Sequence, residues 1–220
     1  MKISGFSKYF FFAFILIFNF IFFPFSHAYA HEVSEITRLL QERYENALDV
    51  SADFYQETFP AGSEHGIKAE GKVYFKRPQK MRWEYKKPDK QLIVTSGQEV
   101  FVYEEEAGQV IIVPRDQFLT SDISKAFFLG KGRLEQHFSI YDVPEAKETV
   151  KLIPKEPSAQ LKEILISIDP ESHLIKEMWL EDHLGGRTHL LFKRIKTNNN
   201  LKSSLFAFSP PEGVDIFRTQ

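Results

Sequence analysis

No cysteine occurs in the 220 residues of this chain. The chain therefore forms no disulfide, and its stability must come from a packed hydrophobic core. Without thiolates, a structural zinc site would need histidine and carboxylate ligands alone. The seven histidines show neither H-E-x-x-H nor H-x-H spacing, so we expect neither a metal site nor a cofactor.

Sequence signatures of catalysis are missing as well. The chain has no G-x-S-x-G nucleophile elbow and no glycine-rich phosphate loop after an expected strand. The acidic run Glu104–Glu106 falls at an expected hairpin tip. The paired carboxylates of a hydrolase need separate, sheltered positions, so this run is better interpreted as a solvated turn. We therefore expect no catalytic residue and no enzymatic activity.

The first thirty residues have the pattern of a secretory signal peptide. A basic segment with Lys2 and Lys8 precedes an almost entirely apolar run, Tyr9–Phe25. Ala28-Tyr29-Ala30 is an A-x-A cleavage site, so we expect cleavage after Ala30 and export to the periplasm. An uncleaved membrane anchor is the alternative, because the apolar run is at the lower limit of length for spanning a bilayer. Bacterial lipoproteins are anchored through a cysteine at this junction, and the junction here has none.

The charge balance excludes another class of partner. Loss of Lys2 and Lys8 with the signal peptide would change the net charge from −2 to −4. Nucleic-acid binding needs a basic stripe, which this chain lacks, so we expect no nucleic-acid partner. The remaining residues, 31–220, are enough for one domain with a sizeable core.

Period-two apolar spacing dominates the chain. Residues 66–106 contain four short alternating runs, each closed by proline or glycine, which is typical of an antiparallel meander. Further strand candidates lie at 50–59, 109–113, 138–143, 149–153, 161–168, 174–181, 188–195 and 204–208, and we expect about ten or eleven strands in all. Helical spacing appears at 31–48 and in a short segment, 121–129, that Gly130 ends. The pattern predicts a mainly β fold, an antiparallel barrel or a strongly curved sheet with helices against it.

A curved antiparallel sheet has a concave face that can leave space for a ligand. The strand residues that we consider for this cavity are Met81, Trp83, Tyr85, Phe101, Tyr103 and Trp179. The short helix adds more apolar bulk than one face of two turns usually buries, and we interpret it as a lid with Ile123, Phe127, Phe128 and Leu129. For each residue taken alone, an ordinary place in the core is the alternative.

One stretch has a more specific pattern. Residues 71–103 read G-x-h-h-h-x-x-P-x-x-h-x-W-x-x-x-x-P and then V-x-x-G-x-x-h-h-h-Y, where h is an apolar residue, and they resemble the LolA family of periplasmic lipoprotein carriers. The matching positions are Gly71, Lys76, Arg77, Pro78, Trp83, Pro88, Gly97 and Tyr103. Residues 51–56 and 206–214 resemble the first strand and the F-x-P-P-x-G-V element of that family, whereas 104–205 match loosely.

The resemblance implies an unclosed antiparallel β-barrel covered by the N-terminal helix and a short helical lid, with an apolar cavity for acyl chains. It implies triacylated lipoproteins as cargo, an inner-membrane ABC transporter of the LolCDE type as donor and an outer-membrane LolB-type acceptor where one is present. We expect a monomer. Arg77 aligns with the arginine that binds carbonyls of the family's lid helices; from the residues alone it would be a surface charge beside a turn. Met81 stands where some relatives carry phenylalanine.

Sibling functions on the same scaffold remain open. They are an acceptor, or a carrier or sensor of another lipid or of mislocalised lipoproteins. An acceptor of the LolB type should carry an anchoring cysteine, and a sensor should carry an additional domain.

Overall fold

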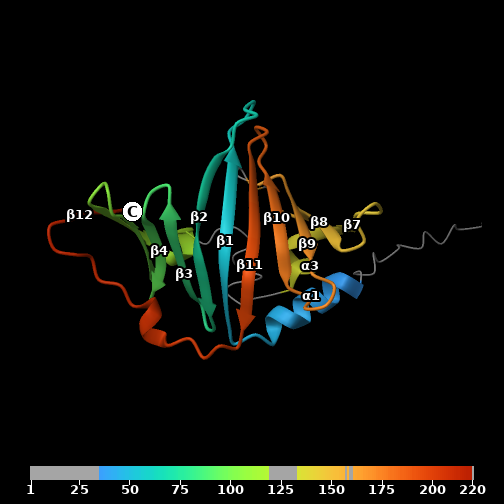
Figure 1. Ribbon diagram of the computed structural model, residues 1–220, viewed down its shortest axis with the longest axis horizontal. Coiled ribbons are helices and arrows are strands. Elements are labelled where there is room, and N and C mark those ends of the chain that lie inside the picture. The colour runs from blue at the N-terminus through green and yellow to red at the C-terminus, as the bar shows by residue number, and fades with distance from the viewer. Residues whose placement is uncertain (1–34, 119–132, 157, 159–160, 220) are drawn as a thin grey trace, which may run out of the picture. The chain divides into compact units, whose positions relative to one another are not determined.

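The computed structural model describes residues 35–118, 133–156, 158 and 161–219 (Figure 1). The helices of these residues are α1 (Glu35–Glu45), α2 (Arg115–Phe118), α3 (Leu134–His137) and the 3-10 helix η2 (Ser203–Phe206). Within the same residues, no helix is long and apolar enough to cross a bilayer.

Twelve strands of the described residues form one sheet. They are β1 (Asp49–Phe59), β2 (Ile67–Lys76), β3 (Lys80–Lys87), β4 (Gln91–Ser96), β5 (Glu99–Glu104), β6 (Gln109–Pro114), β7 (Phe138–Asp142), β8 (Thr149–Pro154), β9 (Glu163–Ile168), β10 (Ile175–Glu181), β11 (Arg187–Thr197) and β12 (Asp215–Arg218). Their order is β12-β6-β5-β4-β3-β2-β1-β11-β10-β9-β8-β7. All neighbours are antiparallel except β12 and β6, and β12 and β7 remain at opposite ends, so the sheet is unclosed. The predicted fold class is confirmed.

The C-terminal region differs from the prediction. The strand expected at 204–208 is wrong, because Ser203–Phe206 forms a 3-10 turn whose Phe206 is buried. Its backbone does not extend the sheet; instead, the carbonyl of Leu205 accepts a hydrogen bond from Arg82 Nη1 at 3.1 Å. The twelve strands of the described residues exceed the expected ten or eleven, and one of them, β12, was not predicted. Its four residues are all exposed and give no alternating pattern.

Side chains of a strand alternate between the two faces, so the register assigns every residue to one face. We call the face that carries Phe54 and Trp83 the inner face and the opposite one, which carries Phe101, the outer face. Gly71 makes the inner face possible where β1, β2 and β3 meet. A Cβ at this position would lie 1.9 Å from the carbonyl oxygen of Glu84 and 2.9 Å from the Phe54 ring. Glycine is therefore required for Phe54 to lie between Trp83 and Tyr85.

The helices cover one half of the inner face. Leu40 of α1 and Leu134 of α3 are fully buried in a core with the aliphatic side chains of β7–β10. A second core joins the end of α1 to β1, β2 and β3 through Ala47, Phe54 and Met81. This half of the sheet is thus a fixed support for α1.

The outer face of β4, β5 and β6 is covered differently. The segment that follows β11 is first held by Asp49, at the start of β1. The Asp49 carboxylate accepts hydrogen bonds from Asn199 N at 2.7 Å and Leu201 N at 3.0 Å. The segment continues over the outer face, where Phe208 and Val214 pack against a buried cluster. In Figure 1 this segment, coloured red, links the lower end of β11 with β12 beside β6.

Candidate functional site

The inner face carries an apolar surface between the covered half and the β4 side of the sheet. Phe54 is fully buried, and Trp83 and Tyr85 lie 4.8 and 4.9 Å from its ring centroid. Trp83 and Tyr85 are themselves only half-buried. Other half-buried apolar side chains pack on the same core; they are Ile93, Leu190, Phe192 and Ile195. The strands β3, β4 and β11 thus jointly present apolar groups that are only partly buried, around the buried Phe54 of β1.

Three predicted cavity residues lie together here. Met81, Trp83 and Tyr85 alternate along β3 and point to the inner face, because Val73 and Phe75 of β2 are opposite Trp83 and Met81. Met81 is buried at the base of this group. These residues form one continuous side of the surface.

Phe101 and Tyr103 lie on the outer face. In the register of β4 and β5, Val94 is opposite Phe101, while Arg82 of β3 is opposite Val94. The two rings pack against Phe208 of the C-terminal segment, with centroids 5.5 and 5.8 Å from it. The structure therefore separates them from Trp83 by the thickness of the sheet.

Trp179 also belongs to the outer face, on β10. Its ring stacks on His189 of β11 with centroids 4.3 Å apart, and it lies 6.2 Å from Phe59. Its indole Nε1 donates a hydrogen bond to Glu177 Oε1 at 3.1 Å, and the same oxygen is 2.7 Å from His189 Nε2. The four predicted lid residues, Ile123, Phe127, Phe128 and Leu129, lie outside the described residues.

Arg77 follows β2 at one end of the inner face and binds the last turn of α1 and the link from α1 to β1. Its Nε donates to the carbonyl of Ala47 at 3.0 Å and its Nη2 to the carbonyl of Tyr44 at 2.7 Å. Its backbone N–H donates to Leu48 O at 2.9 Å. The last carbonyls of a helix lack intrahelical donors and carry partial negative charge, so a guanidinium is well matched to them. Among the helices of the described residues, α1 is the one that accepts a hydrogen bond from Arg77.

Tyr44 fastens the same helix end to the other half of the sheet. Its hydroxyl accepts a hydrogen bond from the backbone N–H of Ile175, at the start of β10, at 3.3 Å. Burial raises the pKa of Tyr44 to about 12, because it disfavours the charged phenolate. Tyr44 contacts both inner-face cores, which gives the end of α1 a defined position on the sheet.

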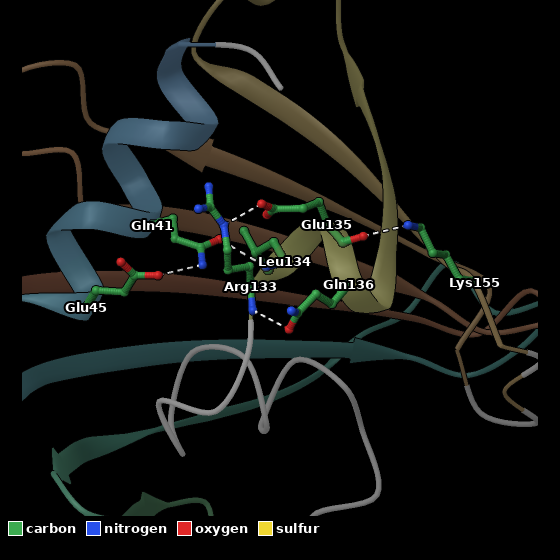
Figure 2. A network of polar contacts seen from close by, with 7 residues as sticks. All are labelled: Gln41, Glu45, Arg133, Leu134, Glu135, Gln136 and Lys155. Atoms are coloured by element: carbon green, nitrogen blue, oxygen red, sulfur yellow. Dashed lines mark hydrogen bonds and ion pairs between the residues drawn. The ribbon is translucent and has the colours of Figure 1, made fainter. Parts of the chain in front are cut away.

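Gln41 connects α1 with Leu134, the first residue of α3. Figure 2 shows its side chain between Glu45 and Leu134: Oε1 accepts from Leu134 N at 2.9 Å, and Nε2 donates to Glu45 Oε1 at 2.7 Å. Beside it, Arg133 N donates to Gln136 Oε1 at 2.9 Å. Gln41 and Tyr44 were not predicted from the sequence. The available signal was that both share the helix face of Leu40, where a polar side chain needs a partner.

A groove of about 480 Å³ lies at the other end of the inner face, and we call it the inner groove. It is lined by Ala69, Tyr85, Pro88, Asp89, Lys90, Gln91, Glu104, Glu106 and Ala107. The Tyr85 hydroxyl donates to Gln56 Oε1 at 3.1 Å, and burial raises the pKa of this phenol. At about 3.3 Å per strand residue, Ala69 lies ~23 Å along β2 from Lys76, the residue before Arg77. The apolar surface therefore runs from a closed end at Arg77 to a polar groove.

Comparisons with known proteins identify relatives in sequence and a protein of similar fold. The family model described as "Outer membrane lipoprotein carrier protein LolA" matches residues 45–209. The outer-membrane lipoprotein carrier protein of Nitrosomonas europaea is 34% identical over 174 residues, 78% of this chain and 84% of that protein. The protein of the same name from Methylococcus capsulatus is 33% identical over 181 residues, 81% and 85% of the two chains. In fold, the chain is similar to an uncharacterized conserved protein from Thermus thermophilus, with TM-score 0.53, 16% identity and coverage of 84% and 98%.

Proposed function

This chain belongs to the LolA family of outer membrane lipoprotein carrier proteins, and from that membership we propose that it holds lipoproteins by their acyl chains and carries them to the outer membrane. The observation that carries the proposal is the half-buried apolar surface of the inner face around Trp83. Each methylene that leaves water contributes about 0.8 kcal/mol, so a long acyl chain costs more than ~10 kcal/mol to keep in water. A carrier must therefore supply such a surface.

We assign acyl-chain binding to Met81, Trp83 and Tyr85, with Phe54 beneath them and Phe192 beside them. Aromatic rings at 4.8 to 6.5 Å from Trp83 give this surface a fixed shape. Phe101, Tyr103 and Trp179 are excluded from the assignment, because they pack on the outer face. The lid role of residues 121–129 stays a prediction from the sequence.

Arg77 is proposed as a latch that holds the end of α1 against the sheet. A carrier has to release its cargo to the next protein, so binding must be weaker than the apolar surface alone would provide. A helix end held by two reversible hydrogen bonds can weaken binding in this way. The helix end has to detach before cargo binds, and the free energy of detachment lowers the apparent affinity for cargo. The guanidinium suits the task, because it cannot lose its charge and presents several donors at once.

For the remainder of the pathway we propose export with cleavage after Ala30 and a single carrier domain over residues 31–220, acting as a periplasmic monomer. The cargo is a triacylated lipoprotein. It would be received from an inner-membrane ABC transporter of the LolCDE type and passed to a LolB-type acceptor where one is present. No enzymatic step is part of this proposal.

Site-specific photo-cross-linking tests the binding face. A benzophenone amino acid replaces Trp83 in one variant and Trp179 in the other, and each protein is loaded with a radiolabelled triacylated lipoprotein. We expect cross-links to the acyl chains from position 83 and not from position 179, because the sheet separates the two residues. Cross-links only from position 179 would refute the assignment. Retained loading in both variants, measured by co-purification, shows that the replacement itself did not abolish binding.

A further inference from the structure

The inner groove opens from the proposed acyl-binding surface. Tyr85 belongs to both, and its ring centroid is 6.4 Å from that of Trp83. The opposite end of the surface is occupied by the end of α1, which Arg77 binds. A polypeptide attached to a bound acyl chain has to leave the inner face. The inner groove, with a volume of about 480 Å³, provides space for it.

The walls of the inner groove are acidic. Asp89, Glu104 and Glu106 line it together with a single basic residue, Lys90. The Lys90 ammonium lies 3.0 Å from the Glu105 carboxylate, so its charge is already matched by a fourth acid beside the groove. This leaves a net negative charge where the groove meets solvent.

Glu104 is held in place within this group. Its Oε1 accepts a hydrogen bond from Gln91 Nε2 at 3.2 Å, and its Oε2 accepts one from Gln109 Nε2 at 2.5 Å. Both donors are neutral amides, so they orient the carboxylate without cancelling its charge. Because Glu104 is only half-buried, its field reaches a ligand in the groove.

The inner groove also borders strand backbone that can pair with a ligand. Strand β2 pairs with β1 down to Ile67, but its register with β3 begins only at Glu70. Residues 67–69 therefore extend past the end of β3, and Ala69 lines the inner groove. An extended peptide is a suitable occupant of such a position, since it can add main-chain hydrogen bonds to a strand that has room beside it.

We propose that the inner groove receives the extended polypeptide that follows the acylated residue of the cargo and selects it by charge, favouring basic over acidic sequences. This inference rests on the proposed carrier function and adds a determinant of which lipoproteins are held. The acyl chain supplies most of the affinity, and the acidic groove sets the preference through charge complementarity.

The test uses two synthetic lipopeptides with identical diacylglyceryl cysteines. In one, the four residues after the cysteine are lysines, and in the other they are glutamates. At an ionic strength near 0.05 M we expect the lysine lipopeptide to bind about tenfold more tightly, since each unlike pair at several ångströms in water contributes only modestly. At 1 M salt the Debye length falls to about 3 Å, and the preference should fall below about twofold.

Variants assign the preference to the groove. The double variant Asp89→Asn, Glu106→Gln removes two charges without touching the hydrogen-bonded Glu104, and we expect it to lose most of the preference. The matched control, Glu145→Gln with Glu171→Gln, neutralises two exposed acids in the turns that follow β7 and β9 and should keep the preference.

Three outcomes would overturn the inference. Equal affinity of the wild-type protein for both lipopeptides would refute the charge selection and leave the carrier function standing. An unchanged preference in the Asp89→Asn, Glu106→Gln variant would show that the selection arises elsewhere. Failure of both lipopeptides to bind, while the protein remains folded, would refute the carrier function and the inference with it.

Discussion

Replacing Arg77 by leucine is the perturbation whose size the structure defines best. The guanidinium donates two hydrogen bonds, to Tyr44 O at 2.7 Å and Ala47 O at 3.0 Å. A hydrogen bond from a charged group contributes about 1.5–3 kcal/mol, and a cation at a helix C-terminus adds about 0.3–1 kcal/mol. Because Arg77 is half-buried, we take about 1.5 kcal/mol for each of the two hydrogen bonds, the lower end of that range. The attachment of α1 should therefore weaken by about 3 kcal/mol.

This loss should appear locally before it appears globally. About 1.4 kcal/mol corresponds to a factor of ten, so the detached state of the α1 end should become more populated by about two orders of magnitude. Hydrogen exchange of the amides in residues 43–48, followed by mass spectrometry, measures this population directly. Because opening then costs less, cargo should be held more tightly and transferred to the acceptor more slowly by Arg77→Leu.

The matched control is Arg115→Leu. Arg115 also donates to a backbone carbonyl, Gly97 O at 2.8 Å, but at the β4–β5 turn, and it does not contact α1 in the hydrogen bonds of the described residues. Arg77→Lys keeps the charge and loses the two-pronged geometry, so it should fall between the wild type and Arg77→Leu. The reasoning is refuted if Arg77→Leu and Arg115→Leu show the same exchange in residues 43–48.

Three further predictions concern the supports of the site. Tyr44→Phe should lower the free energy of unfolding at pH 7 by about 1–2 kcal/mol, because Ile175 N–H loses an acceptor. The folded pKa of Tyr44, about 12, is above its unfolded value of 10.0, so Tyr44 should account for a loss of roughly 2–3 kcal/mol as pH rises from 10 to 12. The raised pKa values of Tyr74 and Tyr85 act in both proteins, so urea unfolding should show a loss in the variant that is smaller by this amount. Phe101→Ala should cost about 3–5 kcal/mol in thermal or urea unfolding yet leave acyl-chain cross-linking intact, since its ring packs on the outer face. Gln41→Ala leaves the buried N–H of Leu134 without its acceptor and should cost about 1–3 kcal/mol, and a cost below about 0.5 kcal/mol in urea unfolding would contradict the role shown in Figure 2.

The strands could be predicted because their signal is local. In β3, the apolar residues Met81, Trp83 and Tyr85 alternate with charged ones between two prolines, and the observed strand matches that run. The same logic failed at Phe206 and Phe208. Their spacing is typical of a strand, but the segment is held by contacts with residues more than a hundred positions away, which no local pattern contains.

The sequence could only partly predict which face of the sheet each strand residue occupies. The turn at Gly97 sets Ser96 opposite Glu99, so the phase of β5 relative to β4 follows from a two-residue loop. The connection from Tyr85 to Gln91 is longer, and its length does not fix which face of β4 continues that of β3. The sequence therefore could not decide that Phe101 lies opposite to Trp83.

Arg77 illustrates the remaining gap. Its residue type beside a proline predicts a surface charge, and the resemblance to a family adds a latch. The identity of the helix that it binds depends on how Asp49, at the start of β1, pairs with Lys76 at the end of β2. That pairing brings the end of α1 to Arg77, and it is a property of the sheet rather than of either segment.

Native mass spectrometry of the protein purified from the periplasm with its cargo tests the central claim most directly. The carrier function predicts a complex of one protein with one triacylated lipoprotein, and loss of that complex when Trp83 is replaced by aspartate in a protein that still folds. A protein that instead carries phospholipid or glycolipid, with no lipoprotein, would mean that the fold serves another lipid and would contradict the proposed carrier function.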